Sequence, residues 1–197
     1  MCRYVVIAVG GLVVLLGLHY IRDQELTSAI YDDDYSRVEA LLGQGANPND
    51  ADPDLLTTAV HDAATGSDAR MLSLLLKHGG DPNVIDWQGV SPLIDATFAN
   101  CPDSVRLLLS YHADPKVSCS QWGTALDVAA TYGYADVAQL LVQNGADPTI
   151  RWRGKTAAQI VKANGYREVL DALEHKYHPI QVASARKITV TIGMTSP

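Results

Sequence analysis

A short motif recurs in this chain at a nearly constant spacing. The copies 33 residues apart read Gly80-Asp81-Pro82, Ala113-Asp114-Pro115 and Ala146-Asp147-Pro148, and a looser copy 34 residues earlier reads Ala46-Asn47-Pro48. A period of about 33 residues is typical of small structural units that stack side by side. One such unit cannot bury enough apolar surface alone, so we expect the units to fold only as a stack. A stack forms long surfaces more readily than catalytic pockets, which favours binding as the function.

Each repeat carries the pattern of two helices joined by a loop. Ser91, Thr124 and Thr156 each follow a glycine by one or two residues and precede small, apolar residues. Ser and Thr are preferred helix N-caps, and Pro92 suits a first helical position. A second apolar segment follows and contains the recurring pairs Leu74/Leu75, Leu107/Leu108, Leu140/Leu141 and Ala172/Leu173. The pattern predicts a first helix that starts at the N-cap and a second helix that packs on its copies.

This arrangement resembles the ankyrin repeat, in which a hairpin-like turn precedes a Thr-Pro-Leu-His helix start, a loop and a second helix ending in Gly-Ala-Asp-Pro. The resemblance implies an all-α solenoid of about five helix-turn-helix units with short β-hairpin-like turns. The predicted repeat domain spans 26–177, in units 26–49, 50–83, 84–116, 117–149 and 150–177. The chain departs from the family where Ile94, Asp127 and Gln159 replace the histidine. The first two units are degenerate, and Thr57-Thr58-Ala59-Val60-His61 only echoes the motif.

The N-terminus has a different composition from the repeats. Residues 4–21 contain no Asp, Glu, Lys or Arg. As a helix this run would reach about 27 Å, close to the roughly 30 Å of a bilayer core. We therefore predict a single transmembrane helix or signal helix over residues 1–22. An uncleaved anchor is favoured over a cleaved signal, because the bulky Leu18-His19-Tyr20-Ile21 offers no small-x-small cleavage site. A buried helix is the third alternative.

The few charges beside this segment indicate an orientation. Arg3 precedes the apolar run, whereas Arg22 is followed by Asp23 and Glu25. The positive-inside rule then favours a single-pass protein with the repeats on the non-cytoplasmic side, which is the periplasm in a bacterium. Export after signal cleavage is the alternative location. The glycines of the run do not form a Gly-x-x-x-Gly motif, so we expect a monomer.

Charge is unevenly distributed along the chain, whose net charge is -7. The segment from Asp23 to Pro148 carries 19 acidic and five basic side chains, whereas Thr149 to Pro197 carries three acidic and eight basic ones. An acidic chain is not expected to bind nucleic acid, which requires a basic surface. The acidic charges either solvate a long surface or form a face that steers a basic partner.

The candidate binding residues are mostly aromatic. Trp87, Trp122 and Trp152 each precede the glycine of their unit by one or two residues, which places them in the hairpins on one edge of a stack. Such a row either anchors a partner, since Trp is enriched in binding hot spots, or covers the adjacent hairpin and stabilises the fold. The other candidate contacts lie at or near the ends of first helices and comprise Phe98, Tyr132, Asp95 and Asp127.

Residues for catalysis or metal binding do not group in the sequence. The pair His175-x-x-His178 offers only two metal ligands, and the sequence has no phosphate loop or paired-cysteine zinc motif. We therefore predict no metal, no cofactor and no catalytic residues. Cys101 and Cys119 would lie at opposite ends of a helix of about eight residues, roughly 12 Å, so we predict two free thiols.

The sequence thus predicts a membrane-tethered repeat protein, and its resemblance to ankyrin repeats implies a protein-interaction module that binds a protein partner through hairpin tips and the concave face. An alternative is a regulator or immunity-type inhibitor that occludes a basic partner enzyme with its acidic face. A third hypothesis is an enzyme or metal site on the repeats. The C-terminal tail, residues 178–197, either forms a strand on a partner's sheet, as its alternating Lys187–Ile192 segment allows, or stays disordered.

Overall fold

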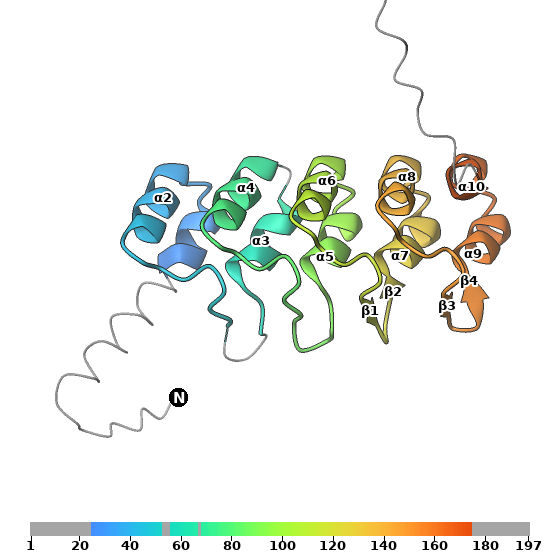
Figure 1. Cartoon of the computed structure of the whole chain (residues 1–197), viewed down its shortest axis with the longest axis horizontal. Coiled ribbons are helices and arrows are strands. Elements are labelled where there is room, and N and C mark those ends of the chain that lie inside the picture. The colour runs from blue at the N-terminus through green and yellow to red at the C-terminus, as the bar shows by residue number, and fades with distance from the viewer. Residues whose placement is uncertain (1–24, 53–55, 67, 175–197) are drawn as a thin grey trace, which may run out of the picture.

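The computed structural model describes residues 25–52, 56–66 and 68–174. Helix pairs stack in a single row, and the two helices of each pair run back and forth across it (Figure 1). The first pair consists of helical residues 25–31 and α2 (Tyr35–Gly43). The following pairs are α3 (Ala59–Thr65) with α4 (Ala69–Lys77), α5 (Pro92–Phe98) with α6 (Pro102–Ser110), α7 (Ala125–Tyr132) with α8 (Ala135–Gln143), and α9 (Ala157–Asn164) with α10 (Arg167–Glu174).

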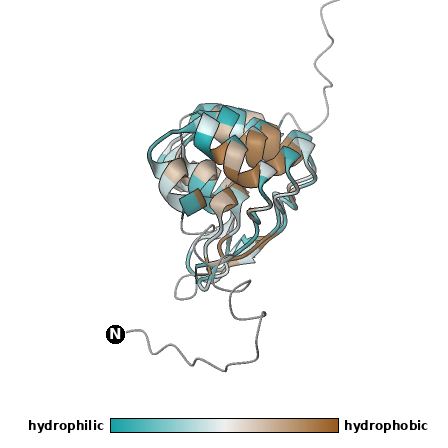
Figure 2. Cartoon of the chain, turned by 90° about the vertical axis from the view of Figure 1, so that its left-hand side faces the viewer, coloured by the Kyte–Doolittle hydropathy of each residue, from teal (hydrophilic) through white to brown (hydrophobic). Residues whose placement is uncertain are grey.

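The loops between pairs project together to one side of the helices, as the view along the stack shows (Figure 2). Two of them contain antiparallel strand pairs. These are β1 (Ser118–Cys119) with β2 (Gly123–Thr124), and β3 (Arg151–Trp152) with β4 (Lys155–Thr156). The loop before α5 closes differently, because the Asp86 carboxylate accepts the N–H groups of Gln88 and Val90, both at 2.8 Å. A side chain therefore supplies at this turn part of what strand pairing supplies in the next two loops.

The predicted N-caps of the first helices are confirmed. The side-chain oxygens of Ser91, Thr124 and Thr156 each accept the backbone N–H three residues later. The residues that replace the family histidine complete this cap in two units, because Asp127 and Gln159 accept the N–H of Thr124 and Thr156 in return. These reciprocal bonds satisfy donors that a helix start otherwise leaves unpaired.

His61 forms the same cap in the second unit and also links two units. Its Nδ1 lies 3.2 Å from the Thr58 backbone N, and its Nε2 lies 3.2 Å from the Val90 carbonyl oxygen. The Nδ1 atom must accept from the Thr58 N–H, so the ring proton is on Nε2 and is donated to Val90. Burial lowers the pKa of His61, which keeps this neutral tautomer. The degenerate motif of the second unit is therefore complete in its hydrogen bonds.

One continuous apolar core runs through the stack from Leu26 to Leu173. In the leucine pairs of the second helices, the second leucine is fully enclosed, and Leu75, Leu108 and Leu141 are all 0% exposed. Their partners Leu74 and Leu107 are only partly buried at the edge of the core.

Asparagine side chains connect the loops of consecutive units. Asn49 donates to the Gly79 carbonyl at 2.9 Å and accepts the Asp81 N–H at 2.7 Å. Asn83 repeats both bonds one unit later, to the His112 carbonyl and the Asp114 N–H. Backbone groups that the turns leave open are paired in this way across the unit boundary.

Both cysteines outside the N-terminal segment are free, as predicted. Cys101 is the N-cap residue of α6, and Cys119 is buried in β1. The length of a helix separates the two positions, which is why no disulfide joins them.

The predicted membrane location is overturned by the helices of the described segments. None of the helices in residues 25–52, 56–66 and 68–174 is long and apolar enough to cross a bilayer. The longest of them have nine residues, whereas a spanning helix needs about 20. The predicted anchor, residues 1–22, lies outside the described residues, as does the tail 178–197.

Replacing Leu108 by Ala should lower the free energy of unfolding by about 2–5 kcal/mol, because the lost methyl groups leave a cavity in the enclosed core. Leu107→Ala is the matched control, since it removes the same atoms one residue earlier at a partly buried position. Urea unfolding of the two variants would measure both effects. Equal losses would contradict the assignment of Leu108 to the core.

Candidate partner-binding surface

One side of the stack is built from the first helices α3, α5, α7 and α9 and the loops that precede them (Figure 1). We call it the first-helix face. All seven residues predicted as partner contacts belong to these helices and loops, and Phe98 and Tyr132 are the last residues of α5 and α7. Their environments differ, however, and the differences separate possible contact residues from structural ones.

The three tryptophans do not form a uniform row. Trp87 lies in the turn before α5 and is 59% exposed. Trp122 is half-buried between β1 and β2, and its ring meets Phe98 edge to face with centroids 5.0 Å apart. Trp152 is half-buried and packs on the preceding loop, where its indole N–H donates to the Ser120 carbonyl at 3.4 Å. Trp152 therefore covers the adjacent hairpin, as the structural alternative for the tryptophans predicted. Trp87, in contrast, is open to solvent.

An aromatic cluster connects the third and fourth units on this face. We use this name for Phe98, Trp122, Tyr132 and Tyr134. Phe98 meets Tyr132 edge to face at 5.8 Å, and Tyr132 stacks on Tyr134 at 5.7 Å. Tyr132 is 44% exposed, so the cluster offers solvent an aromatic surface. Its geometry suits aromatic and cationic groups of a partner.

Sequence reasoning missed Tyr134, which follows Tyr132 by two residues. Gly133 between them adopts a left-handed conformation with φ 81°, and this reversal brings the two rings together. The glycine between two tyrosines at a helix end was the signal available in the sequence.

Asp127 has a structural role rather than an exposed one. Its side chain is buried, and Oδ2 accepts from both the N–H and the hydroxyl of Thr124 at 2.9 Å. Burial raises the pKa of Asp127, while these hydrogen bonds from Thr124 lower it. The carboxylate is already used in the helix cap, which argues against Asp127 as a partner contact.

Asp95 is the most perturbed of the predicted site residues. Burial, together with the negative charges of Asp86 and Asp62, raises its pKa to about 7. Among the described residues, no hydrogen bond or ion pair compensates this carboxylate. Strongly perturbed groups without a structural partner are typical of functional sites.

Asp62 and Tyr31 were also missed by sequence reasoning. Asp62 stands 33 residues before Asp95 and so holds the equivalent place on α3, a signal that the repeat register contained. Tyr31 donates its hydroxyl to Asp62 Oδ1 at 3.4 Å and is itself 74% exposed. The first-helix face therefore carries carboxylates at corresponding places in two neighbouring units.

The described residues contain no group of three or more His, Cys, Asp or Glu side chains arranged to hold a metal ion. His175 and His178 lie outside the described residues.

Gly123→Ala should destabilise the fold more than Gly154→Ala does. Both glycines have left-handed backbones, with φ of 76° and 78°, so the backbone strain of alanine is matched at about 1–2 kcal/mol. A Cβ at Gly123 would lie 2.5 Å from Asp127 Oδ2 and 2.7 Å from Trp152 Cγ, whereas a Cβ at Gly154 meets no atom within 4 Å. Thermal unfolding of the two variants measures the difference. Equal melting temperatures would mean that Asp127 and Trp152 do not pack closely against this loop.

Asp95→Asn should stabilise the protein at pH 7.5 but not at pH 4. The carboxyl has a pKa near 3.8 when unfolded and about 7 when folded, so the folded protein retains a proton that the unfolded chain loses between these values. Wild-type stability therefore falls as the pH rises through this window, and the neutral amide avoids the loss. We expect a gain on the order of 1–3 kcal/mol in urea unfolding at pH 7.5. A gain in Asp95→Asn that is equal at pH 7.5 and pH 4 would refute a strained carboxyl.

Comparison with known proteins places these features in a family. The family profile described as "Ankyrin repeats (3 copies)" matches residues 26–119, and the profile "Ankyrin repeat" matches residues 123–153. Similar curated proteins include BCL-6 corepressor-like protein 1 of Homo sapiens, 26% identical over 114 residues that make up 55% of this chain and 6% of the relative.

Two further relatives show the same partial coverage. The B-cell lymphoma 3 protein homolog of Mus musculus is 31% identical over 121 residues, which are 60% of this chain and 26% of that protein. Ankyrin repeat domain-containing protein 63 of Homo sapiens is 30% identical over 125 residues, which are 60% of this chain and 33% of that protein. The matched region thus spans a third or less of each of these relatives. The matched profiles and the stacked helix pairs together show that the chain belongs to the ankyrin-repeat family.

Proposed function

We propose that this chain binds a partner protein without catalysing a reaction, through exposed aromatic side chains and partly buried acidic side chains of its first-helix face. The observation that carries the proposal is the Asp95 carboxylate, whose charge no neighbouring group of the described residues compensates. The same helix, α5, ends in Phe98 of the aromatic cluster. Asp95 and Phe98 are three residues apart on α5 and so lie on one side of the helix.

The chemistry of this surface indicates a partner segment that is basic and contains a planar or aromatic group. A cation beside Asp95 would compensate a charge that now destabilises the fold, and Asp62 and Asp86 contribute to the same negative field. Aromatic rings beside the carboxylates favour arginine or aromatic side chains of a partner, as in many binding hot spots. Trp87 and Tyr132 are among the large exposed side chains of the described residues and are available for such contacts.

The family supports the same proposal by analogy. Ankyrin repeats are stacked units whose loops and first helices form an extended surface. The relatives share this region within much longer proteins, and a shared fold does not imply a shared role. The partner is instead defined by the chemistry that this chain presents.

The second candidate is a regulator or immunity-type inhibitor that occludes a basic enzyme. The negative field at Asp62, Asp86 and Asp95 favours it, because an acidic face attracts a basic active-site rim. Purified chain would then inhibit the enzyme stoichiometrically, and rising salt would relieve the inhibition. If the partner has no activity that this chain inhibits, partner binding alone is the function.

A crosslinking experiment tests the proposed surface. A photoreactive benzoylphenylalanine replaces Tyr132 on the first-helix face or, as a control, the exposed Ser110 on α6 of the opposite row. We expect a specific crosslinked protein from position 132 and not from position 110. Equal crosslinking from both positions would contradict binding at the first-helix face.

Variants of the tryptophans then separate binding from stability. With the crosslinked partner purified, Trp87→Ala should weaken affinity about tenfold or more with little change in melting temperature, because its indole is exposed in the free protein. Trp152→Ala should do the reverse, since this ring packs on the neighbouring loop. If Trp152→Ala weakened the affinity and Trp87→Ala lowered the melting temperature, Trp152 rather than Trp87 would be the binding residue.

A further inference from the structure

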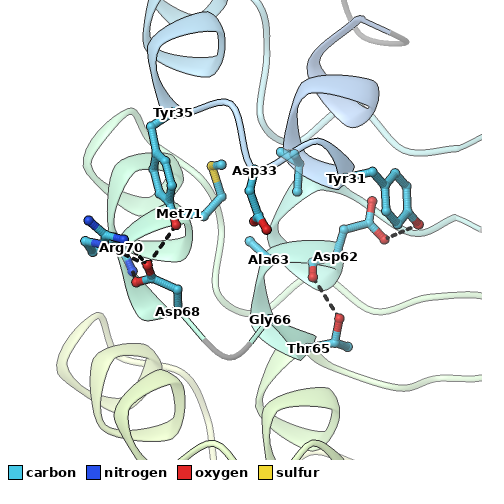
Figure 3. A pocket seen from close by; sticks show the side chains of 11 residues that line it. Tyr31, Asp33, Tyr35, Asp62, Ala63, Thr65, Gly66, Asp68, Arg70 and Met71 are labelled. Atoms are coloured by element: carbon cyan, nitrogen blue, oxygen red, sulfur yellow. Dashed lines mark hydrogen bonds and ion pairs between the residues drawn. The ribbon is translucent and has the colours of Figure 1, made fainter.

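A pocket of about 560 Å³ lies between the first two helix pairs, away from the aromatic cluster. Figure 3 shows its two sides, with the Tyr35, Asp68 and Arg70 side chains on one and the Tyr31 and Asp62 side chains on the other. The Asp33 carboxylate lies between them, and Met71, Ile30 and Ala63 add an apolar lining. Pockets of this size with a few converging polar groups are typical ligand sites.

One side of the pocket already holds a cation of the protein itself. The Arg70 guanidinium lies over the Tyr35 ring, 4.9 Å from its centroid, and its NH2 atom lies 2.5 Å from Asp68 Oδ2. The Tyr35 hydroxyl donates to the same carboxylate oxygen at 2.9 Å. These hydrogen bonds hold the pKa of Asp68 well below its usual range. On this side of the pocket the aspartate is therefore paired with a guanidinium and hydrogen-bonded to a tyrosine.

The other side has the same components without the cation. Tyr31 donates its hydroxyl to Asp62 of α3 at 3.4 Å, and Tyr35 donates in the same way to Asp68, the N-cap residue of α4. Neither Asp62 nor Asp33 makes an ion pair within residues 25–52, 56–66 and 68–174. Burial raises the pKa of Asp62, and the hydrogen bond from Tyr31 offsets this effect only in part. Tyr31 and Asp62 thus repeat the tyrosine–aspartate pair of the other side, but no cation of the described residues pairs with this carboxylate.

We infer that this side of the pocket accepts an arginine side chain of the partner, with the guanidinium between Asp62 and Asp33 and its flat face toward the Tyr31 ring. A guanidinium is the group that the occupied side selects, and its planar donors suit two carboxylates and an aromatic wall. The inference rests on the proposed partner binding, but it specifies a pocket and a chemical group that can be tested without the partner.

The test is a titration of the isotopically labelled full chain, followed by NMR. The probe is Nα-acetyl-arginine N-methylamide, and the controls are the neutral citrulline analogue and the lysine analogue, all at matched ionic strength. We expect saturable shifts at the amides of Tyr31, Thr65 and Gly66, with an affinity on the order of 1–10 mM for one exposed guanidinium. The citrulline analogue should give no saturation, and the lysine analogue should bind several-fold more weakly.

Two variants remove the proposed contacts without altering the shape of the pocket. Asp62→Asn keeps an acceptor for Tyr31, and Asp33→Asn suits the left-handed backbone of Asp33, whose φ is 53°. Each should weaken arginine binding about tenfold, whereas Asp136→Asn, which removes the same charge from an exposed position on α8, should not.

The outcomes are distinct. Equal binding of arginine and citrulline, equal binding of arginine and lysine, or an equal loss in Asp136→Asn would overturn the guanidinium pocket. Failure of this titration together with retained crosslinking at position 132 would remove the pocket alone. The reverse combination would retain the pocket and remove the aromatic cluster around Tyr132 as the main contact surface.

Discussion

The packing of each helix pair on the next is the interaction on which the rest of this structure depends. A single pair has too little apolar area for a core, and enclosure of residues such as Leu75, Leu108 and Leu141 requires a neighbour on each side. Because the core is continuous from Leu26 to Leu173, the loops are held in a fixed order along one side. The binding surface is therefore a product of the stacking, since no unit forms it alone.

The polar links between units change along the stack. In the N-terminal units, Asn49 and Asn83 pair the backbone groups of adjacent loops. At the last boundary Trp152 and Arg153 link the loops instead. The indole N–H donates to the Ser120 carbonyl, and the guanidinium donates to the Gln121 carbonyl. The same requirement, pairing of loop backbone groups, is met at two boundaries by asparagine amides and at the last boundary by an aromatic residue and a cation.

The first-helix face contains groups that the fold does not need. Asp95 lies partly buried near two other carboxylates, and Asp62, at the equivalent position one unit earlier, is a second carboxyl whose pKa burial raises. A solenoid tolerates such unfavourable charges because its stability comes from the core between the helix rows. The first-helix face is then free to carry acidic and aromatic side chains suited to a basic partner, which is the physical basis of the proposed function.

The sequence by itself determined the repeat, the two helices of each unit, the N-caps at Ser91, Thr124 and Thr156, and the separation of Cys101 from Cys119. These features depend on local patterns of a few residues that recur with a fixed period. Only the tertiary structure decided that Trp87 is exposed while Trp152 is packed, that Asp95 is an uncompensated acid, and that Tyr31 and Asp62 face a pocket. These outcomes depend on which side chain lies opposite in the neighbouring unit, about 30 residues away, and local pattern carries no record of that pairing.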